Sequence, residues 1–253
     1  MAITTLKVLA SLLQLHGPGA TIQSDHQGIN YTWKMKVPTY NDILRPWWGK
    51  LLVGMQYFTT GGGPLAKSIN HGGGFFKTSD ALERPNMQLY FQAFSTLIPR
   101  EGERPLLTPD PWSGMSIGLS NCRPTSRGHI ELACADPAKY PVIHPNYLAT
   151  QADIDDVLAG NRLLKQIART KPLADIITEE LIPGAHVDGD EALLADFRAR
   201  ADTVYHPTST CMMGPDAATS VVDVRLRVHG VDGLRVVDAS VFPTITSGNT
   251  NAP

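Results

Sequence analysis

The sequence predicts an α+β fold in which an antiparallel sheet is flanked by helices. Three strand-like runs lie together in the middle of the chain, at residues 87–97, 115–120 and 129–133, and Pro or Gly separates each from the next. Segments with helical spacing of apolar residues lie before and after these runs. Because the strands are clustered and do not alternate with helices, a parallel βαβ array is not favoured.

Two elements are expected before the first long helix. Residues 6–15 have the apolar spacing of a helix, which the Gly-Pro-Gly run at 17–19 ends. Residues 29–35 have the composition of a strand, and Pro38 follows them. The chain is therefore expected to enter the sheet region early.

Residues 40–58 are predicted to form one long helix. Asn41 or Asp42 can cap it, and Pro46 is compatible only with its first turn. The Gly-rich run at residues 59–64 should end the helix.

Two further helices are expected after the sheet. Residues 153–168 place Ile, Val and Leu near helical spacing and begin with three aspartates, which suit the positive end of a helix dipole. Residues 190–200 form the second. The sheet should therefore have helices encoded on both sides of it.

Composition excludes several classes of partner and site. The 253 residues contain 22 Lys and Arg against 24 Asp and Glu, a formal net charge of -2, so no basic excess exists to bind nucleic acid or an anionic membrane. The apolar run at residues 8–13 is too short to span a bilayer. We expect a cytoplasmic protein with no integral membrane segment, and peripheral membrane association stays open. The chain is long enough for one large or two modest domains.

The cysteines indicate neither a disulfide framework nor a metal site. There are three, without Cys-x-x-Cys spacing: Cys122, Cys134 and Cys211. An odd number without that spacing predicts no thiolate zinc site, and a reducing compartment is the default.

An esterase interpretation rests on two short motifs. The run His-Gly-Gly-Gly at residues 71–74 and Gly-Met-Ser-Ile-Gly at residues 114–118 imitate an oxyanion loop and a nucleophile elbow around Ser116. An elbow needs a buried strand before the serine and a helix directly after it, whereas prolines precede Ser116 and Pro and Gly interrupt the residues after it. Ser116 is therefore expected inside a strand, and the esterase is the third alternative.

The closing stretch carries the strongest candidate chemistry. Residues 206–214 read His-Pro-Thr-Ser-Thr-Cys-Met-Met-Gly, residues 234–240 read Leu-Arg-Val-Val-Asp-Ala-Ser, and residues 247–253 read Ser-Gly-Asn-Thr-Asn-Ala-Pro. Pro207 and the hydroxyl residues after it can hold His206 on a tight turn in one orientation, as a proton acceptor requires. A histidine pKa of about 6.5 leaves the ring largely neutral in the cytosol. Residues 234–239 are expected to form a strand.

These three segments together resemble the glucose-methanol-choline (GMC) oxidoreductases, of the choline-dehydrogenase-like and alcohol-dehydrogenase-like type. Other landmarks of that family recur upstream and extend the match over most of the chain from about Leu12, at residues 23–26, 63–66, 73–76, 124–132, 136–137 and 145–148. The resemblance implies a flavoprotein that binds FAD and oxidises a small-molecule alcohol. Neither the alcohol nor the electron acceptor, oxygen or a quinone-like compound, follows from it.

The resemblance also implies roles for individual residues. His206 would take the hydroxyl proton while the α-hydride passes to the flavin, and Asn251 would hydrogen-bond the substrate oxygen. The backbone of Asp238 and Ala239 would approach the FAD pyrophosphate, and Thr250 and Asn251 would lie beside the isoalloxazine ring. Tyr205 is expected on the substrate-facing wall.

The resemblance implies three regions. Residues 1–36 would be a remnant of the FAD-binding domain or a linker, residues 37–204 the substrate-binding domain, and residues 205–253 an active-site segment that returns to the FAD-binding α/β domain. The Gly-x-Gly-x-x-Gly fingerprint of that domain is absent from the sequence. We therefore expect the C-terminal part of a GMC enzyme, inactive and weakly flavin-binding alone, which pairs with a missing N-terminal half or with itself. A non-catalytic binding or structural remnant is the alternative.

Overall fold

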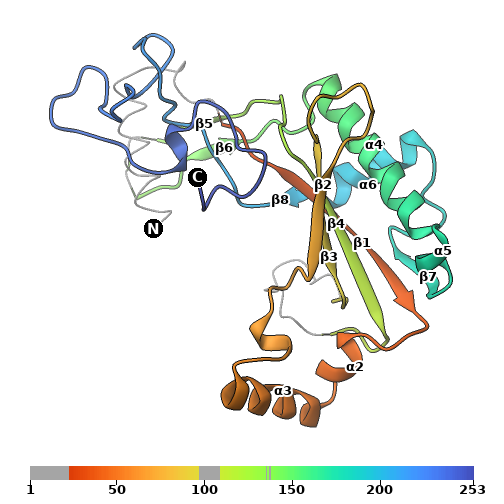
Figure 1. Cartoon of the computed structure of the whole chain (residues 1–253). Coiled ribbons are helices and arrows are strands. Elements are labelled where there is room, and N and C mark those ends of the chain that lie inside the picture. Colours follow the sequence, from red (N-terminus) through yellow and green to blue (C-terminus); the bar gives the residue numbers. More distant parts are fainter. Residues whose placement is uncertain (1–22, 97–108, 135, 137) are drawn as a thin grey trace. The chain divides into compact units, whose positions relative to one another are not determined.

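The computed structural model describes residues 23–96, 109–134, 136 and 138–253 of the chain (Figure 1). The helix expected at residues 6–15 lies outside the described residues. The chain divides into two compact units. The sheet unit comprises the described residues within Gly28–Ser120 and Asp156–Asp202, and the loop unit comprises those within Met1–Gln27, Asn121–Asp155 and Thr203–Pro253.

A six-stranded sheet organises the sheet unit. Its order is β2 (Gly72–Phe76), β3 (Met87–Gln92), β4 (Gly114–Asn121), β1 (Gln27–Met35) and β7 (Ile177–Ile182), and β8 (Asp202–Thr203) also pairs with β1. Strand β1 is antiparallel to both β4 and β7, and β2 is antiparallel to β3. The expectation of an antiparallel sheet flanked by helices is confirmed.

Helices α4 (Gln151–Ala168) and α6 (Asp190–Arg200) lie together along one side of this sheet, with the short α5 (Lys171–Ala174) between them in sequence (Figure 1). Gly160 of α4 sits so close to β3 and β4 that a Cβ there would lie 2.7 Å from side-chain atoms of Met87 and Leu119. The largest fully buried side chains of this core come from the strands and the two helices: Trp33, Tyr31, Phe197, Met87, Leu119, Leu164, Leu193 and Val157. Burial of this apolar surface is the main force that holds the unit together.

The helix expected at residues 40–58 is two helices. α2 (Tyr40–Leu44) and α3 (Trp47–Thr60) are separated at Pro46, which is the N-cap of α3. A proline has no N–H to donate and disfavours helical backbone in the residue before it, so one continuous helix cannot pass through it. The predicted caps were also wrong: Thr39 is the N-cap of α2, and its backbone N–H donates to the carboxylate of Asp42 at 2.8 Å in a capping box.

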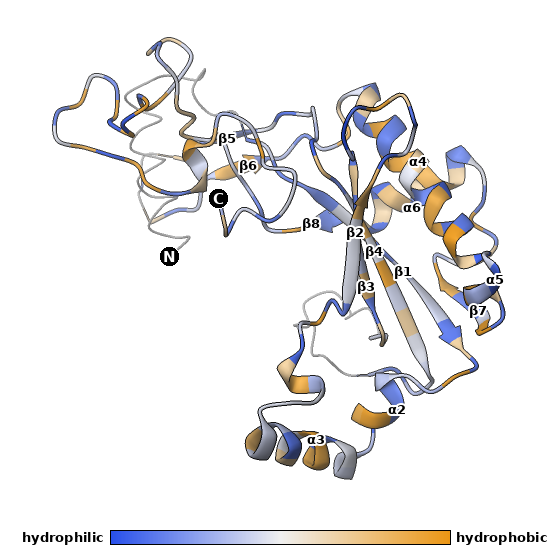
Figure 2. Cartoon of the chain, in the orientation of Figure 1, coloured by the Kyte–Doolittle hydropathy of each residue, from blue (hydrophilic) through white to orange (hydrophobic). Residues whose placement is uncertain are grey.

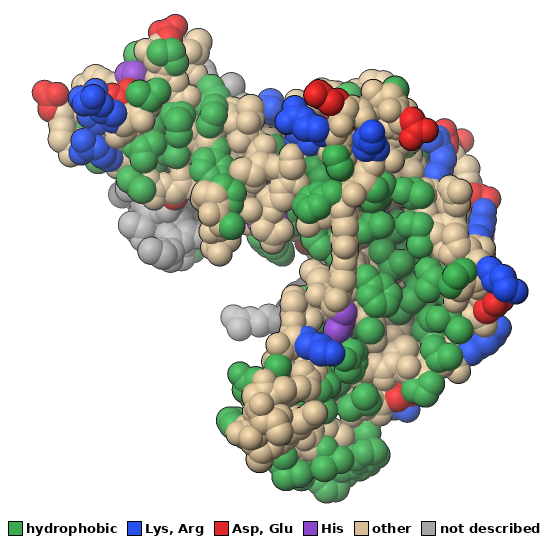
Figure 3. All heavy atoms as spheres, in the orientation of Figure 1, with side chains coloured by type: hydrophobic (Ala, Val, Ile, Leu, Met, Phe, Trp, Pro, Cys, Tyr) green, Lys and Arg blue, Asp and Glu red, His purple; other side chains and the backbone are tan. Residues whose placement is uncertain are grey.

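Helix α3 ends at Gly61, which has φ 65° and so adopts the left-handed conformation that glycine favours at this position. Several large apolar side chains of α3 are exposed within the described residues: Trp47, Trp48, Leu51, Leu52, Met55 and Phe58. Figure 2 shows hydrophobic residues along the ribbon of α3, and Figure 3 shows hydrophobic side chains on the surface in the part of the molecule where α3 lies. None of the described helices combines the length and the apolarity needed to cross a bilayer.

Other predicted elements agree with the structure at their cores. The strands expected at residues 29–35 and 115–120 are β1 and β4, and the two later helices are α4 and α6. The run at 87–97 contains β3, which ends at Gln92. The run at 129–133 forms β5 (His129–Glu131), but β5 pairs with β6 (Val142–His144) in a separate two-stranded sheet and does not join the main one.

Strand β2 was missed because its sequence, Gly-Gly-Gly-Phe-Phe, is typical of a loop. One of its three glycines is required by the close approach of β3: a Cβ on Gly73 would lie 2.4 Å from the carbonyl oxygen of Leu89. This strand contains the glycines of the supposed oxyanion loop. Ser116, the supposed nucleophile, is buried inside β4 with its hydroxyl 3.0 Å from that of Thr32, as expected for a strand residue and contrary to an esterase elbow.

The loop unit has little regular structure. Its apolar core is formed mainly by residues outside helices and strands: Ile130, Cys211, Val221, Val222, Val228, Val236 and Val241. The strand expected at residues 234–239 was wrong. Arg235 makes a single bridge to Arg227, and the short η3 (Ala239–Val241) begins within the expected strand. The chain reverses at Gly230 and Gly233, both with positive φ, so the paired segments are too short for a ladder.

Candidate active site

His206 is held at its backbone by residues 24–25 of the loop unit. The amide N–H of Thr208 donates to the carbonyl oxygen of Ser24 at 2.8 Å, and that of Ser24 donates back to Thr208 at 3.2 Å. The amide N–H of His206 donates to Oδ1 of Asp25 at 3.1 Å. Because Pro207 fixes the intervening backbone dihedral, the histidine is constrained from both sides. The sequence prediction of an oriented His206 is consistent with this arrangement.

The ring of His206 contacts a second histidine. Its Nδ1 lies 3.3 Å from Nδ1 of His26, and the two rings are nearly perpendicular, at 89°. His26 is buried, and its Nε2 lies 3.1 Å from the carbonyl oxygen of Cys122 and 3.0 Å from that of Thr246. The histidine pair therefore joins segments that are 180 positions apart in the sequence.

Burial favours the neutral form of both rings. It lowers the pKa of His26, and hydrogen bonding to the Cys122 carbonyl only partly opposes this. Burial also lowers the pKa of His206, and the nearby carboxylate of Asp25 acts in the opposite direction. A neutral imidazole has a free lone pair, so His206 can accept a proton at neutral pH.

Asp25 ties the histidine turn to the rest of the loop unit. Its Oδ2 accepts a hydrogen bond of 2.7 Å from the hydroxyl of Tyr147 and another from the hydroxyl of Thr203, while Oδ1 holds the His206 amide. Asp25 is buried, and these donors compensate for the removal of its carboxylate from water.

The closing segments are attached to this same region. The Thr246 carbonyl contacts His26, and Arg123 donates to the hydroxyl of Ser247 at 3.0 Å. The amide N–H groups of Cys211 and Met213 donate to the carbonyls of Ser240 and Val241, each at 2.9 Å. The first two segments of the closing stretch are therefore hydrogen-bonded to each other, and the third is joined to the loop unit through Arg123.

The predicted site residues differ in how directly they are connected to the His206 segment. Asp238 and Ala239 directly precede Ser240 and Val241, which contact the His206 segment. Asn251 is exposed, and no hydrogen bond within the described residues joins it to His206. It follows Thr246 by five residues, a span of at most roughly 17 Å for an extended chain. Tyr205 is 77 % exposed and has φ 62°, a conformation uncommon for a tyrosine.

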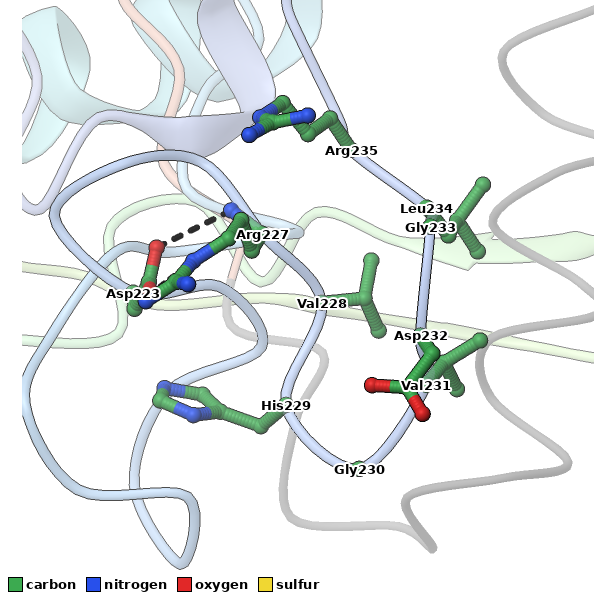
Figure 4. A pocket seen from close by; sticks show the side chains of 10 residues that line it. All are labelled: Asp223, Arg227, Val228, His229, Gly230, Val231, Asp232, Gly233, Leu234 and Arg235. Atoms are coloured by element: carbon green, nitrogen blue, oxygen red, sulfur yellow. Dashed lines mark hydrogen bonds and ion pairs between the residues drawn. The ribbon is translucent and has the colours of Figure 1, made fainter.

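A pocket of about 510 Å³ lies elsewhere in the loop unit, lined by Asp223 and residues 227–235 (Figure 4). The Arg227 guanidinium donates to Oδ2 of Asp223 at 2.7 Å across it and lowers the pKa of that carboxyl to about 2. His229 is already engaged, with Nε2 3.1 Å from the carbonyl oxygen of Gly214. The pocket contains none of the predicted site residues, so it is not assigned as the active site.

One group of side chains within the described residues could hold a metal ion, although the sequence predicted none. His129 and Glu131 of β5 and His144 of β6 place one donor atom each within 4.8 Å of one another. All three are exposed. The cluster contains none of the predicted site residues.

Comparison with known proteins decides the family. The family model described as GMC oxidoreductase matches residues 124–253, which is more than half of the 253-residue chain. The chain belongs to the GMC oxidoreductase family. The resemblance inferred from the closing motifs is confirmed, and the match includes His206, Asp238, Ala239 and Asn251.

Among curated proteins, this GMC chain is 39 % identical over 203 residues to an alcohol dehydrogenase [acceptor] of Pseudomonas putida, covering 80 % of the chain and 36 % of that protein. It is 36 % identical over 241 residues to an oxygen-dependent choline dehydrogenase of Pseudomonas syringae, covering 94 % and 41 % respectively. The mitochondrial choline dehydrogenase of Mus musculus is 37 % identical over 205 residues, covering 81 % and 33 %. The chain thus spans well under half the length of these relatives.

Solved structures show the same fold. A formate oxidase of Aspergillus oryzae superposes with a TM-score of 0.81 at 23 % identity, over 97 % of this chain and 49 % of that one. A fungal aryl-alcohol oxidase gives a TM-score of 0.73 at 22 % identity, over 95 % and 48 %. The GMC fold is therefore common to proteins whose sequences have diverged widely.

Sequence reasoning identified the Gln-Ser-Asp-His run at residues 23–26 only as a family landmark and gave no role to Asp25 or His26. Tyr147 was likewise only part of a landmark. The contacts that give these residues a role join positions more than 100 apart in the chain, and sequence spacing carries no signal for them. A polar Asp-His pair directly before a strand was the one clue.

Proposed function

We propose that this chain supplies the substrate domain and the active-site segment of an FAD-dependent oxidoreductase that acts on the CH–OH group of alcohol donors. His206 is the base and Asn251 the hydrogen-bonding partner of the substrate oxygen. Tyr205 contributes to the substrate wall. The printed names of the relatives, an alcohol dehydrogenase and choline dehydrogenases, support an alcohol as the donor.

The observation that carries this proposal is the arrangement around His206. A neutral histidine is fixed at its backbone by Asp25 and at its ring by His26, and the carbonyl of Thr246 at the start of the closing segment binds the same His26. A general base must be held in one orientation with its lone pair available. Backbone and ring constraints together meet the first requirement, and the lowered pKa of His206 meets the second.

The residues at the two cofactor segments fit FAD. The carboxylate of Asp238 accepts two hydrogen bonds from Ser240, one from its backbone N–H and one from its hydroxyl. The amide N–H groups of Asp238 and Ala239 make no hydrogen bond to any residue that the structure describes, so they remain available to phosphate oxygens. The side chains of Thr250 and Asn251 are likewise unpaired within the described residues and can meet the polar edge of a flavin ring.

In the proposed reaction, FAD supplies a hydride acceptor for the alcohol carbon. The rest of the chemistry belongs to this chain. Nδ1 of His206 is engaged with His26, so Nε2 is the atom that would accept the hydroxyl proton. The Asn251 amide would donate to the same substrate oxygen and favour the alkoxide as the proton leaves. The alcohol loses one proton and one hydride and becomes a carbonyl compound.

The proposal is tested with a chimera in which this chain replaces the matching part of the choline dehydrogenase from Pseudomonas syringae. Flavin absorbance of the purified chimera reports whether the cofactor is held, and choline together with a panel of primary alcohols reports turnover. We expect FAD to bind and at least one alcohol to be oxidised. A chimera that carries FAD but oxidises no alcohol would contradict the proposal.

The alternative is a non-catalytic binding or structural remnant. Flavin titration of the 253-residue chain and of the chimera separates the two functions. We expect weak or no FAD binding by the chain alone, and self-association or pairing with an N-terminal half. Stoichiometric flavin in a purified monomer of the chain alone would overturn that expectation.

A further inference from the structure

His26 occupies a position from which it can control the protons of His206. Its Nε2 faces two carbonyl oxygens, those of Cys122 and Thr246, at 3.1 and 3.0 Å. A carbonyl oxygen only accepts hydrogen bonds, so Nε2 of His26 must carry a hydrogen and donate it. The protonation of this nitrogen is therefore fixed by main-chain groups.

The state of the other nitrogen of His26 follows from burial. The ring is 2 % exposed, and burial disfavours its charged form. A neutral ring with hydrogen on Nε2 has a lone pair on Nδ1, which can only accept. The contact of 3.3 Å with Nδ1 of His206 then requires that His206 donate, with its hydrogen on Nδ1.

We propose that His26 is a positioning residue that holds His206 in the tautomer with hydrogen on Nδ1 and a free lone pair on Nε2. The carbonyls of Cys122 and Thr246 fix His26, and His26 fixes His206. This assignment deepens the proposed function and rests on it for its catalytic meaning, because Nε2 is the atom that would receive the alcohol proton. The tautomer itself is a property of the chain alone.

The direct test is a long-range ¹⁵N–¹H NMR spectrum of the chain labelled with ¹⁵N-histidine, recorded at pH 7.5 without flavin or substrate. His26→Gln and His206→Gln variants assign the two rings among the eight histidines. We expect hydrogen on Nε2 of His26 and on Nδ1 of His206. A spectrum that places the His206 hydrogen mainly on Nε2 would overturn the inference.

Two variants at position 26 test whether His26 sets the tautomer of His206. The side-chain amide introduced by His26→Gln has an oxygen that can accept from His206 and an NH₂ group that can donate to the two carbonyls, so the Nδ1–H tautomer should persist. His26→Leu removes the acceptor, and the His206 ring should shift toward a mixture of tautomers. Unchanged tautomers in a folded His26→Leu chain would contradict the role.

In the chimera, His26→Leu should lower kcat more than it raises KM, and His26→Gln should restore most of kcat. This readout is separate from the spectrum. If His206→Ala leaves turnover intact while the spectrum shows the Nδ1–H tautomer, the proposed function fails and the tautomer assignment stands. If the spectrum shows the other tautomer while His206→Ala abolishes turnover, the tautomer assignment fails and the proposed function stands.

A second and independent observation concerns the two-stranded sheet of the loop unit. The register of β5 and β6 places His129 directly opposite His144, and side chains alternate along a strand, so Glu131 lies on the same face. The two imidazole rings stack with centroids 4.5 Å apart. Nε2 of His129 is 3.0 Å from one carboxylate oxygen of Glu131, and Nε2 of His144 is 3.9 Å from the other.

We infer that His129, Glu131 and His144 form a binding site for a divalent transition-metal ion such as Zn²⁺. Two imidazole nitrogens and one carboxylate are a ligand set that zinc takes, with water in the fourth position. Mg²⁺ and Ca²⁺ prefer oxygen ligands and should compete poorly. A bound ion would join β5 to β6 and stabilise the small sheet.

Isothermal titration of the EDTA-treated chain with Zn²⁺ at pH 7.5 tests this site. We expect one saturable equivalent of Zn²⁺ per chain. Loss of a residue that only supports a metal ligand costs about 10-fold to 100-fold in metal affinity. His144→Ala and Glu131→Gln each remove a ligand itself, so each should weaken Zn²⁺ binding by more than that. His186→Ala, an exposed histidine outside the cluster, is the matched control.

Absence of a saturable equivalent would overturn the metal site. Binding that survives both His144→Ala and Glu131→Gln would also overturn it, because the ion would then be held elsewhere. A titration with Mg²⁺ in place of Zn²⁺ should show no saturable binding. These variants lie away from His206, so the result bears on neither the tautomer nor the proposed function.

Discussion

The two units of this chain are stabilised in different ways. The sheet unit buries large apolar side chains such as Trp33, Phe197 and Leu119 between strands and helices. The loop unit has a smaller core of valines and depends on buried polar groups, with Asp25 and His26 each bonded to several partners. Burial of apolar surface tolerates volume-conserving changes, whereas a buried polar network depends on every partner. The candidate active site lies in the unit whose geometry depends on hydrogen bonds.

Phe197→Ala should produce the largest stability change and should act through the sheet unit. The Phe197 side chain of α6 is 1 % exposed, so truncation leaves a cavity and should cost about 3–5 kcal/mol of unfolding free energy. Urea denaturation followed by circular dichroism measures the change. Leu65→Ala, at a side chain that is 56 % exposed, is the matched control and should change little. A Phe197→Ala loss below that of the control would contradict the core assignment.

Gly160→Val should lower the free energy of unfolding by about 1–3 kcal/mol, because the added atoms would force Met87 and Leu119 away from α4.

Gly54→Ala in α3 should raise the free energy of unfolding. Nothing lies within 4 Å of a Cβ there, so the helix should gain about 0.4–1 kcal/mol from lower entropy of the unfolded chain. Thermal denaturation of both variants measures the contrast. Equal effects at the two glycines would contradict the close packing of α4 on the sheet.

Acid should weaken the histidine pair in a predictable direction. Folding lowers the pKa of both His26 and His206, so their contribution to stability is fully present above about pH 6.5, the unfolded value. It is lost as the pH falls from there through the lower folded pKa values, because the unfolded chain binds protons first. His26→Gln removes one of these groups, so its midpoint in urea should fall less than that of the wild type between about pH 7 and about pH 5.5. Parallel pH profiles of the two proteins would contradict this.

Asp25→Asn should lower the pKa of His206 further. The Asp25 carboxylate is the group that raises this pKa against the effect of burial, and asparagine keeps a similar shape without the charge. An NMR titration of the His206 ring measures the shift. The chemical shift of His71, in the sheet unit, should titrate as before and serves as the internal control. An increase in the His206 pKa would show that the carboxylate is not the opposing charge.

The smallest predicted effect concerns thiol chemistry. Cys134 is exposed, whereas Cys122 and Cys211 are buried, and burial raises the pKa of Cys211 to about 11. Only the thiolate reacts with iodoacetamide, so Cys134 should be alkylated first and Cys211 much later. Mass spectrometry of peptides over time measures the order. Early modification of Cys211 would indicate that the loop-unit core is open.

Sequence reasoning worked differently in the two units. In the sheet unit, periodicity located β1, β4, α4 and α6, because burial of one face imposes a repeat on the residues. It missed β2, where β3 comes so close at Gly73 that a side chain does not fit, and only the fold reveals this approach. Proline chemistry was considered at Pro46 but given too little weight, and one helix was predicted where there are two.

In the loop unit, periodicity failed and motifs succeeded. The apolar run at residues 234–239 predicted a strand, but the chain there turns too sharply to form a ladder. The same residues nevertheless carried the family resemblance that the family model confirms. The motifs located His206 but not His26, because a contact between positions 26 and 206 leaves no trace in local spacing.

The most direct measurement is the rate at which an alcohol bleaches the flavin in the chimera, with and without His206→Ala, in the absence of oxygen. If His206 is the base, the variant should bind FAD normally and be bleached about 10²-fold or more slowly, since a positioned general base contributes about that much. Near-normal bleaching by a His206→Ala chimera that holds its FAD would remove His206 from the mechanism.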